Sequence, residues 1–356
     1  MIESQKWGEY KGEPVYRYTL SNEAGASCGL TNYGGRITSL RVPDGHGEAV
    51  ETVLGYSDLG SYLEDEHFLG AIVGRYANRI EAGEFSLEEE EFSLTCNDGP
   101  HHLHGGEVGF DKRLWRAEPV KLAEGPGVRL RYLSRDGEEG YPGNLSVRVT
   151  YLLTEANEFE MRFEASADRP TIVNITNHNY YNLSPDDDTV LDHELFVDSD
   201  RFIPIDAEGI PTGESRSVEE TPFDFREPKT IEDGISSGDD QIRFPGGYDH
   251  SFVLNEGPGP DAGLRSPASG VSLTLKTNQP GLQVYSANYL KGRAAGSGNS
   301  PRGPQSAVCL EPGNFPNAPN EPRFPNPVVR PGQPYEATTR LGFRAEPSRD
   351  SGQHDG

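Results

Sequence analysis

Phe159-Glu160-Met161-Arg162-Phe163-Glu164-Ala165 places apolar side chains at every second position and charged side chains at most of the positions between them. Successive side chains of a β-strand point to opposite faces of a sheet, so this alternation predicts a strand with one buried face and one solvated face. Three further segments repeat the period of two, at residues 128–132, 147–151 and 271–275. Together these segments predict an antiparallel sheet as the basis of the fold.

The rest of the chain favours strands joined by turns. It contains 42 glycines and 28 prolines, and no stretch sustains a helical period of 3.6 residues beyond a helical turn near residues 56–66. Many short strands separated by turn signals are typical of a sandwich or barrel. We therefore predict an all-β fold, a large single-domain antiparallel β-sandwich over residues 1–345. Residues 291–305 are expected to form a mobile surface loop between two strands, and residues 346–356 a disordered C-terminal tail.

The chain is strongly acidic, with 57 acidic residues against 32 basic ones and a formal net charge of -25. Nucleic acids and anionic membranes need a basic surface, so neither is an expected partner. An acidic face for a cationic partner is one interpretation of the charge. We favour a surface solvated for high salt, where self-repulsion is screened, because the acids are scattered and only seven residues are lysines. We therefore hypothesise that the protein comes from a halophilic source.

Cysteine usage indicates a reducing compartment. Cys28, Cys96 and Cys309 are odd in number and have no CxxC spacing, which predicts reduced and mostly buried thiols. The first residues lack a basic region followed by an apolar run, and no stretch has the length of a membrane span. The expected location is the cytoplasm.

The sequence contains little evidence for a nucleotide-binding or metal-binding site. Gly34-Gly35 and Gly105-Gly106 do not belong to a GxGxxG or GxxxxGKS motif. Residues 101–104 contain three histidines, but no second cluster with ligand spacing completes a zinc site. One functional histidine flanked by two incidental loop histidines is the alternative that we prefer. We predict no cofactor and no metal.

Two segments far apart in the sequence carry an acid and a base. Ala307-Val308-Cys309-Leu310-Glu311-Pro312 holds a carboxylate just after an apolar run, and Asn174-Ile175-Thr176-Asn177-His178 holds an imidazole among amides and hydroxyls. A carboxylate and a histidine that face each other across a pocket can act as general base and general acid. Tyr180 and Tyr181 follow, and as successive strand residues they are expected to divide between pocket and core.

Sugar-binding residue types surround these segments. A hexose presents many hydroxyls that donate and accept, so its pocket needs amides, carboxylates, guanidinium and imidazole groups. The chain supplies them in five blocks: Gly74-Arg75-Tyr76-Ala77-Asn78-Arg79-Ile80, Leu103-His104-Gly105-Gly106, residues 176–183, Tyr248-Asp249-His250-Ser251-Phe252, and the Gln283/Glu311 region. A small-molecule sugar is the expected partner.

These blocks resemble those of the aldose 1-epimerase (galactose mutarotase) family. Further fragments of the same kind are residues 30–37, 109–115, 136–143 and 320–325, and all occur in the family's order from about Leu30 to Phe343. The resemblance implies a galactose mutarotase-like supersandwich with its active site in a groove on one sheet. It also implies a cofactor-free isomerase that interconverts the α and β anomers of free aldohexoses such as galactose and glucose by opening and reclosing the ring.

The resemblance also implies roles for individual residues. His178 matches the family's general acid and Glu311 its general base, while Asn78, Arg79, His104, Asp249 and Gln283 match sugar-binding positions; Tyr180 is added as a binding residue. Two segments depart from the family's pattern. Many relatives carry a Thr-Gln-Asn-Trp type of run where this chain has Pro312-Gly313-Asn314-Phe315-Pro316-Asn317. Residues 286–290 also differ from the version that is commonest in the family. The reaction is therefore better defined than the preferred sugar.

Other interpretations stay open for several residues. Arg79 is equally compatible with a surface ion pair, Asp249 with capping the turn after Gly246-Gly247, and Glu311 with a solvated sheet edge. His178 is compatible with a purely structural buried histidine, and His250 and Trp115 are expected to be structural. Alternative functions are a non-catalytic sugar-binding or sensing protein, an epimerase of a phosphorylated hexose, and a polysaccharide-acting enzyme. The sequence leaves open whether the chain is a monomer or a homodimer.

Overall fold

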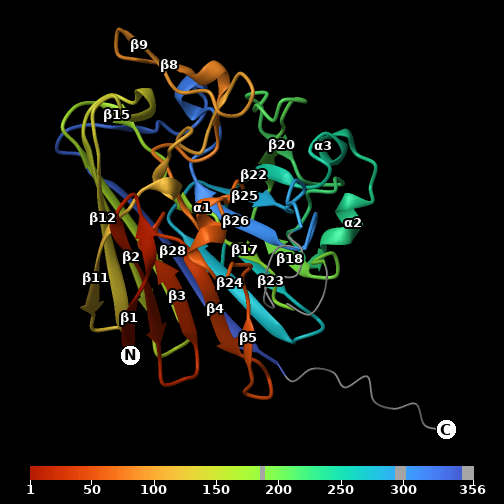
Figure 1. Ribbon diagram of the computed structural model, residues 1–356. Coiled ribbons are helices and arrows are strands. Elements are labelled where there is room, and N and C mark those ends of the chain that lie inside the picture. Colours follow the sequence, from red (N-terminus) through yellow and green to blue (C-terminus); the bar gives the residue numbers. More distant parts are fainter. Residues whose placement is uncertain (185–188, 293–301, 347–356) are drawn as a thin grey trace.

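Three large sheets built from antiparallel strands form the body of the protein (Figure 1). This computed structural model describes residues 1–184, 189–292 and 302–346. The largest sheet has nine strands in the order β11-β12-β13-β14-β28-β24-β23-β18-β21, and each neighbouring pair is antiparallel. Their bounds are β11 Arg116–Lys121, β12 Pro126–Ser134, β13 Leu145–Leu153, β14 Glu158–Ala167, β18 Glu194–Val197, β21 Lys229–Thr230, β23 Ala262–Arg265, β24 Val271–Thr277 and β28 Tyr335–Ala345.

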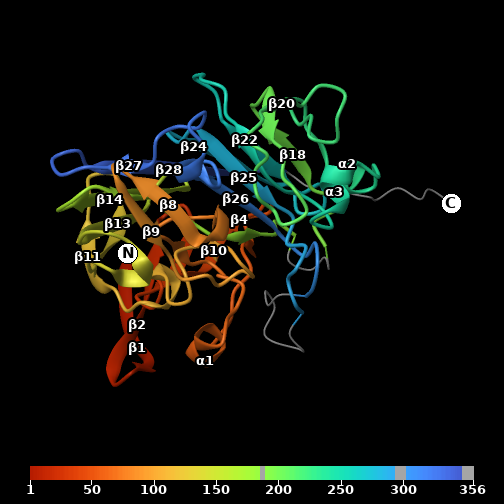
Figure 2. The same cartoon turned by 90° about the horizontal axis from the view of Figure 1, so that it is seen from above.

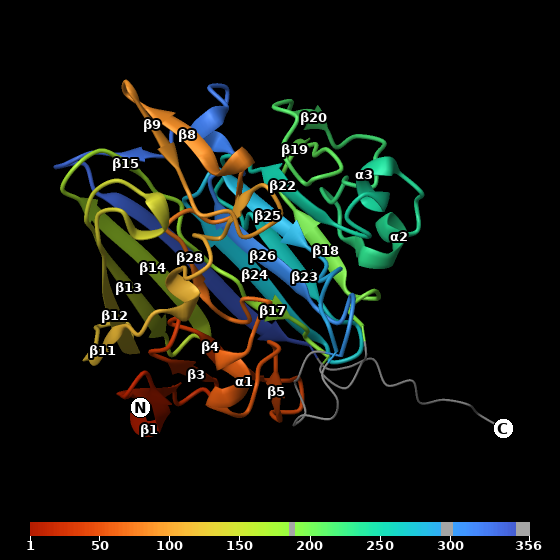
Figure 3. The same ribbon diagram turned by 45° about the horizontal axis from the view of Figure 1, so that its top comes forward.

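Two further sheets complete the large layers. One has six strands in the order β17-β26-β25-β22-β19-β20, and the other has five strands in sequence order. The six are β17 Tyr180–Tyr181, β19 Arg201–Ile203, β20 Arg216–Ser217, β22 Asp249–Val253, β25 Gly281–Tyr285 and β26 Val308–Gly313; the five are β1 Ile2–Tyr10, β2 Glu13–Ser21, β3 Ser27–Thr31, β4 Ile37–Pro43 and β5 Ala49–Glu51. In Figure 3 the strands β22, β25 and β26 lie in front of β23 and β24 of the nine-stranded sheet.

Short pairs of strands and single helical turns connect these sheets, and in Figure 2 the orange pair β8 and β9 lies on the side of the molecule that faces the viewer. The strands are β6 Ile72–Val73, β7 Arg79–Ile80, β8 Glu84–Leu87, β9 Glu90–Ser93, β10 His102–Leu103, β15 Thr171–Ile172, β16 Thr176–Asn177 and β27 Val328–Val329. The α-helices are α1 Leu59–Leu63, α2 Ile231–Ile235 and α3 Asp240–Arg243; the 3-10 helices are η1 Glu81–Gly83, η2 Phe110–Lys112, η3 Glu138–Gly140 and η4 Ala318–Asn320. No helix among the described residues is long and apolar enough to span a membrane.

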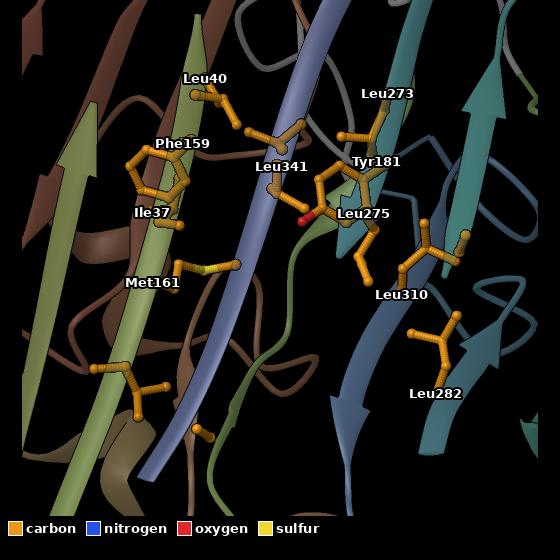
Figure 4. Packing of buried hydrophobic residues seen from close by; sticks show 14 of the residues in the cluster. Ile37, Leu40, Phe159, Met161, Tyr181, Leu273, Leu275, Leu282, Leu310 and Leu341 are labelled. Atoms are coloured by element: carbon orange, nitrogen blue, oxygen red, sulfur yellow. The ribbon is translucent and has the colours of Figure 1, made fainter. Parts of the chain in front are cut away.

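The core lies between the nine-stranded sheet and the other two large sheets (Figure 4). Phe159 and Met161 from β14 belong to the same buried cluster as Ile37 from β4, and Leu275 from β24 belongs to it with Leu310 from β26. Each fully buried side chain of this size stabilises the fold by about 1.5–3 kcal/mol. The packing therefore fixes β26, which carries Glu311, against the large sheet.

The expected elements are largely present. All four alternating segments lie in long strands of the nine-stranded sheet (β12, β13, β14 and β24), and the helical turn near residues 56–66 is α1. Helices α2 and α3 were not expected, because four or five residues are too few to show a helical period. The expected loop at 291–305 does connect β25 to β26, but most of it and the tail from residue 347 lie outside the described residues.

The cysteines are unpaired thiols, as expected. Cys28 and Cys309 are buried, whereas Cys96 is exposed. His250 and Trp115 are buried, and His250 contacts Gln241 through Nε2 at 3.2 Å. These positions are consistent with the structural roles expected for both residues.

Candidate active site

A small pocket of about 150 Å³ collects most of the predicted site residues. One side, here called the sheet wall, consists of Asp249 on β22, Tyr285 on β25 and Glu311 on β26. The other side, here called the loop wall, comes from turns and strand ends. Its members are His67, Phe68, Asn78, Arg79, His104 and His178. Glu66, Leu103, Tyr180 and Tyr289 complete the lining.

Strand register places the sheet wall. Glu311 pairs directly with Gln283, and Ser251 is the partner of Gln283 on the next strand. Gln283 Nε2 donates to Asp249 Oδ1 at 2.7 Å, and Ser251 Oγ donates to Gln283 Oε1 at 2.5 Å. Gln283 is thereby held in one amide orientation, with its donor turned to Asp249.

Backbone hydrogen bonds place His178 in the loop wall. It lies between β16 and β17, its N–H donates to Ala71 O at 2.9 Å, and its carbonyl accepts from Gly70 N at 3.0 Å. Its ring lies 4.9 Å from the Tyr180 ring, with 22° between the two planes. The Nδ1 atom is buried and has no hydrogen-bond partner within the described part of the chain.

Asn78 and His104 hold each other across the ends of two short strands. His104 N donates to Asn78 O at 3.3 Å, and Asn78 N donates to His104 Nδ1 at 3.2 Å. Both residues have a left-handed backbone, with φ of 69° and 52°. Gly105 follows with φ of 92°, and a Cβ there would lie 1.8 Å from Gly74 O, so the turn requires glycine.

Arg79 lies between two carboxylates. Its Nε donates to Asp98 Oδ2 at 2.8 Å, and its Nη1 is 3.7 Å from Asp249 Oδ2. Burial opposes the charge of the guanidinium, but Asp249 and Asp98 outweigh it and raise the pKa of Arg79. Arg79 therefore links the two walls of the pocket and stays cationic.

The predicted acid and the predicted base face each other. His178 Nε2 lies 3.7 Å from Glu311 Oε1, and both side chains are nearly inaccessible to solvent. Burial lowers the pKa of His178 to about 4. Burial, and secondly the charge of Asp249, raise the pKa of Glu311 well above its usual value. Burial thus favours the uncharged form of each group, and a proton held by Glu311 lies within reach of His178.

His104 is a hydrogen-bond donor toward the pocket. Since its Nδ1 accepts from Asn78 N, the proton of the neutral ring belongs on Nε2. Burial, followed by the charges of His178 and Arg79, lowers the pKa of His104 well below its usual value, so the ring stays neutral.

A metal ion fits this donor set poorly, although one ligand atom each from His104, His178 and Glu311 lies within 4.8 Å of the others. Coordination by Nε2 of His104 would require the proton on Nδ1, facing the Asn78 N–H. The hydrogen bond that orients His104 therefore disfavours a metal at these three residues.

The structure brings seven of the eight predicted residues to the pocket, and Gln283 lies behind Asp249 instead. Glu311 is 6% exposed, so it is not a solvated edge residue. Asp249 bonds to Gln283 rather than capping the turn before it. Tyr180 lines the pocket while Tyr181 belongs to the main core, as the strand alternation predicts.

The remaining histidines of the residue 101–104 cluster are buried and bonded, not incidental loop residues. His101 Nδ1 accepts from Ala82 N at 3.1 Å. His102 Nε2 lies 2.6 Å from the Tyr141 hydroxyl, and its Nδ1 lies 2.7 Å from Thr95 O. These contacts stabilise the turn that presents His104.

Sequence reasoning missed four ring-bearing residues of the lining: His67, Phe68, Tyr285 and Tyr289. The sequence pattern could have identified Tyr285, because it lies two positions after Gln283 and so on the same face of β25. His67 and Phe68 lie in an irregular turn, where no periodicity indicates which side chain faces inward.

A larger groove of about 1050 Å³ lies elsewhere and is lined in part by Arg201, Val253, Lys276, Phe315 and Arg323. None of the predicted site residues lines it, and its lining contains no histidine opposite a carboxylate. Size alone therefore does not locate the chemistry in this protein.

Comparison with known proteins agrees with this geometry. The sequence profile of the family described as aldose 1-epimerase matches residues 16–342. The chain is 40% identical to galactose mutarotase of Mus musculus over 335 residues, which cover 93% of this chain and 95% of the relative. It is 37% identical to aldose 1-epimerase of Escherichia coli (strain K12) over 340 residues, 94% of this chain and 97% of the relative.

Solved structures of the same group of enzymes also resemble this chain. The crystal structure of galactose 1-epimerase from Lactobacillus acidophilus superimposes with a TM-score of 0.87 at 30% identity, covering 97% of this chain and 98% of that one. The extent of these matches places the whole sandwich within one group of enzymes. The chain belongs to the aldose 1-epimerase family of carbohydrate isomerases.

Proposed function

We propose that this protein interconverts the α and β anomers of free aldohexoses, with galactose and glucose as substrates. The observation that carries the proposal is the buried pair His178 and Glu311, whose Nε2 and Oε1 atoms lie 3.7 Å apart at the pocket. Ring opening of a pyranose removes the proton of the C1 hydroxyl and delivers a proton to the ring oxygen. The pair offers one acceptor and one donor for these two transfers.

In the reactive form, the shared proton is on His178 Nε2 and Glu311 is a carboxylate. Glu311 takes the C1 hydroxyl proton, His178 protonates the ring oxygen, and the bond between C1 and that oxygen breaks. The resulting aldehyde rotates about C1–C2 and recloses on its other face with the two roles reversed. Each positioned acid or base contributes about 10²–10⁴-fold to such a rate.

Arg79 and His104 are the groups that can stabilise negative charge on the sugar oxygens. Arg79 is held cationic by Asp98 and Asp249, and His104 presents an Nε2 donor because Asn78 occupies its Nδ1. Donors fixed in advance act without reorganising during the reaction. Asp249, oriented by Gln283, is the acceptor that we assign to a sugar hydroxyl.

The other functions considered fit less well. A phosphorylated hexose would require free cations, whereas Arg79, the one Lys or Arg among the described pocket residues, already contacts Asp98 and Asp249. A protein that only binds sugar has no need of an acid facing a base. We therefore favour catalysis on an uncharged hexose.

Polarimetry on freshly dissolved α-galactose and α-glucose tests the proposal, with galactose 6-phosphate as the comparison. We expect the two free sugars to reach anomeric equilibrium much faster than without enzyme, and the phosphorylated sugar to gain little. Spontaneous rates for both free sugars in the presence of folded protein would contradict the proposal.

We also propose a cytoplasmic location and adaptation to concentrated salt. The three unpaired cysteines fit a reducing compartment, and the charge of -25 with seven lysines fits a surface whose self-repulsion salt relieves. Thermal unfolding in increasing KCl is expected to show a rising Tm, and a Tm independent of KCl would contradict salt adaptation. Sedimentation in the same buffers would distinguish monomer from homodimer.

A further inference from the structure

Residues 65–70 form one turn of the loop wall. It carries Phe68, whose backbone is left-handed with φ of 58°, a conformation that is uncommon for a bulky residue. The Phe68 ring lies 4.7 Å from the His104 ring and 6.1 Å from the His178 ring, nearly parallel to the latter at 20°. Phe68 therefore contacts the surroundings of both histidines of the pocket.

Asp65 fixes this turn with both of its oxygens. Oδ2 accepts from Leu69 N at 2.9 Å, and Oδ1 accepts from His67 N at 3.3 Å and from the Tyr56 hydroxyl at 3.2 Å. The two backbone donors, His67 N and Leu69 N, flank Phe68 on either side in the sequence. A left-handed backbone persists when neighbouring contacts enforce it, and these bonds supply that constraint.

Arg36 in turn fixes Asp65. The two side chains are fully buried, Arg36 Nη1 donates to Asp65 Oδ2 at 2.6 Å, and the same Nη1 donates to Leu69 O at 3.0 Å. Burial alone would raise the pKa of Asp65, but Arg36 and the backbone donors outweigh it and keep the pKa below its usual value. Asp111, 3.7 Å from Arg36 Nη2, has a pKa raised by burial to about 6. Asp65 is thus the principal charged partner.

The far end of the turn is joined directly to the general acid. Gly70 N donates to His178 O, and Ala71 O accepts from His178 N. His67 O accepts from the hydroxyl of Tyr180, whose ring lies against His178. A continuous set of hydrogen bonds and ring contacts therefore runs from the buried Arg36 to the His178 imidazole.

We propose that Phe68 is a positioning residue for the proposed reaction, held by the buried Arg36–Asp65 pair so that its ring fixes the His104 and His178 imidazoles and keeps water from them. The inference rests on the proposed function, because His178 must be the acid for its placement to affect the rate. Phe68 itself moves no proton. Its contribution is to hold His178 in register with Glu311.

Phe68→Gly is the sharpest test, because glycine adopts a φ of 58° without strain and leaves the turn intact. We expect kcat for mutarotation to fall by about 10- to 100-fold, as small misplacements of catalytic groups do, while KM changes little. The separate variant Phe68→Tyr keeps the aromatic ring and is expected to have a kcat close to that of the wild type. Lys11→Gly makes the same backbone change at a φ of 52° in an exposed turn and is expected to leave kcat unchanged.

A second variant separates positioning from folding. Arg36→Met/Asp65→Leu removes both buried charges together, but it also removes the acceptor of the His67 and Leu69 N–H groups and of the Tyr56 hydroxyl. Its stability is therefore expected to fall, and circular dichroism verifies that it is folded before its kcat is compared. This double variant should lower kcat to a similar extent, and adding Phe68→Gly to it should cause little further loss, because all three residues act through one placement.

The outcomes separate this inference from the function on which it rests. A wild-type protein that accelerates no sugar's mutarotation refutes the proposed function. An active wild type with a folded Phe68→Gly variant of unchanged kcat refutes the positioning role. A rise in KM at constant kcat also refutes it, since Phe68 would then bind sugar rather than place the histidines.

Discussion

The sheet wall and the loop wall of the pocket are built by different means. Asp249, Tyr285 and Glu311 sit in consecutive hydrogen-bonded strands, so the ladder that forms the fold also sets their spacing. Phe68, Asn78 and His104 occupy left-handed backbone conformations and are held by individual hydrogen bonds. The proposed base, Glu311, therefore belongs to the regular part of the fold, whereas the proposed acid, His178, and the proposed charge-stabilising donors depend on the turns around it.

Arg79 joins the two walls, and its loss is the largest effect that we predict short of removing the acid or the base. Arg79→Gln leaves Asp98 and Asp249 without their cation and removes the donor that we propose for the substrate. We expect kcat/KM to fall by about 10²–10³-fold, the range seen for a single stabilising donor. Steady-state polarimetry measures the fall, and circular dichroism verifies that the variant is folded. A loss below tenfold would mean that the walls are joined without Arg79.

The pH profile tests the opposite pKa shifts of His178 and Glu311, the proposed acid and base. Activity requires one proton on the pair, and burial lowers the pKa of His178 to about 4 while raising that of Glu311. Below about pH 4 the pair binds a second proton, and kcat/KM should fall about tenfold per pH unit. Above the raised pKa of Glu311 the pair loses its proton and the rate falls again. A plateau that begins near pH 4 and ends at the raised pKa of Glu311 is expected, and an acid limb near pH 6.5 would contradict the lowered pKa of His178.

Within the sheet wall, Gln283 is predicted to act through Asp249. Gln283→Leu removes the donor to Asp249 Oδ1, a bond to a charged group worth about 1.5–3 kcal/mol. We expect KM to rise about tenfold or more with a smaller change in kcat. Ser251→Ala, which removes only the bond that orients Gln283, serves as the matched control and should have a weaker effect. Equal effects on both kinetic constants would argue against a pure positioning role.

The smallest predicted effect concerns backbone strain in the loop wall. Asn78 has φ of 69°, so Asn78→Ala should destabilise the protein by about 1–2 kcal/mol more than Asn78→Gly, which tolerates this conformation. Thermal unfolding of the two variants measures the difference. Identical Tm values would show that the turn relaxes and that the loop wall is less constrained than its contacts indicate.

The same contrast explains how far the sequence predicts the structure. The alternation of residues 159–165 and its repeats indicates strands, and those segments form long members of the nine-stranded sheet. Alternation also separates Tyr180 from Tyr181. The register that sets Gln283 opposite Glu311 depends on pairing between segments with an intervening loop, which local periodicity does not encode.

The loop wall was less predictable. The residue types at positions 78, 79 and 104 pointed to sugar chemistry, but their placement depends on left-handed turns and on Gly105 approaching Gly74. Phe68 carries no periodic signal, because its position follows from the contact between Asp65 and Arg36, which are 29 residues apart in the sequence. Long-range polar contacts, rather than propensity, decide this part of the site.

We expect Glu311 and His178 to act as one unit across the two walls. Single-turnover mutarotation of α-galactose by wild type, Glu311→Gln, His178→Asn and the double variant tests it most directly. Each single variant should lose about 10²–10⁴-fold, and the double variant should lose little more than the worse single, because removing either partner abolishes the exchange. Multiplying losses in the double variant, or a single variant that is folded and as fast as wild type, would contradict the account.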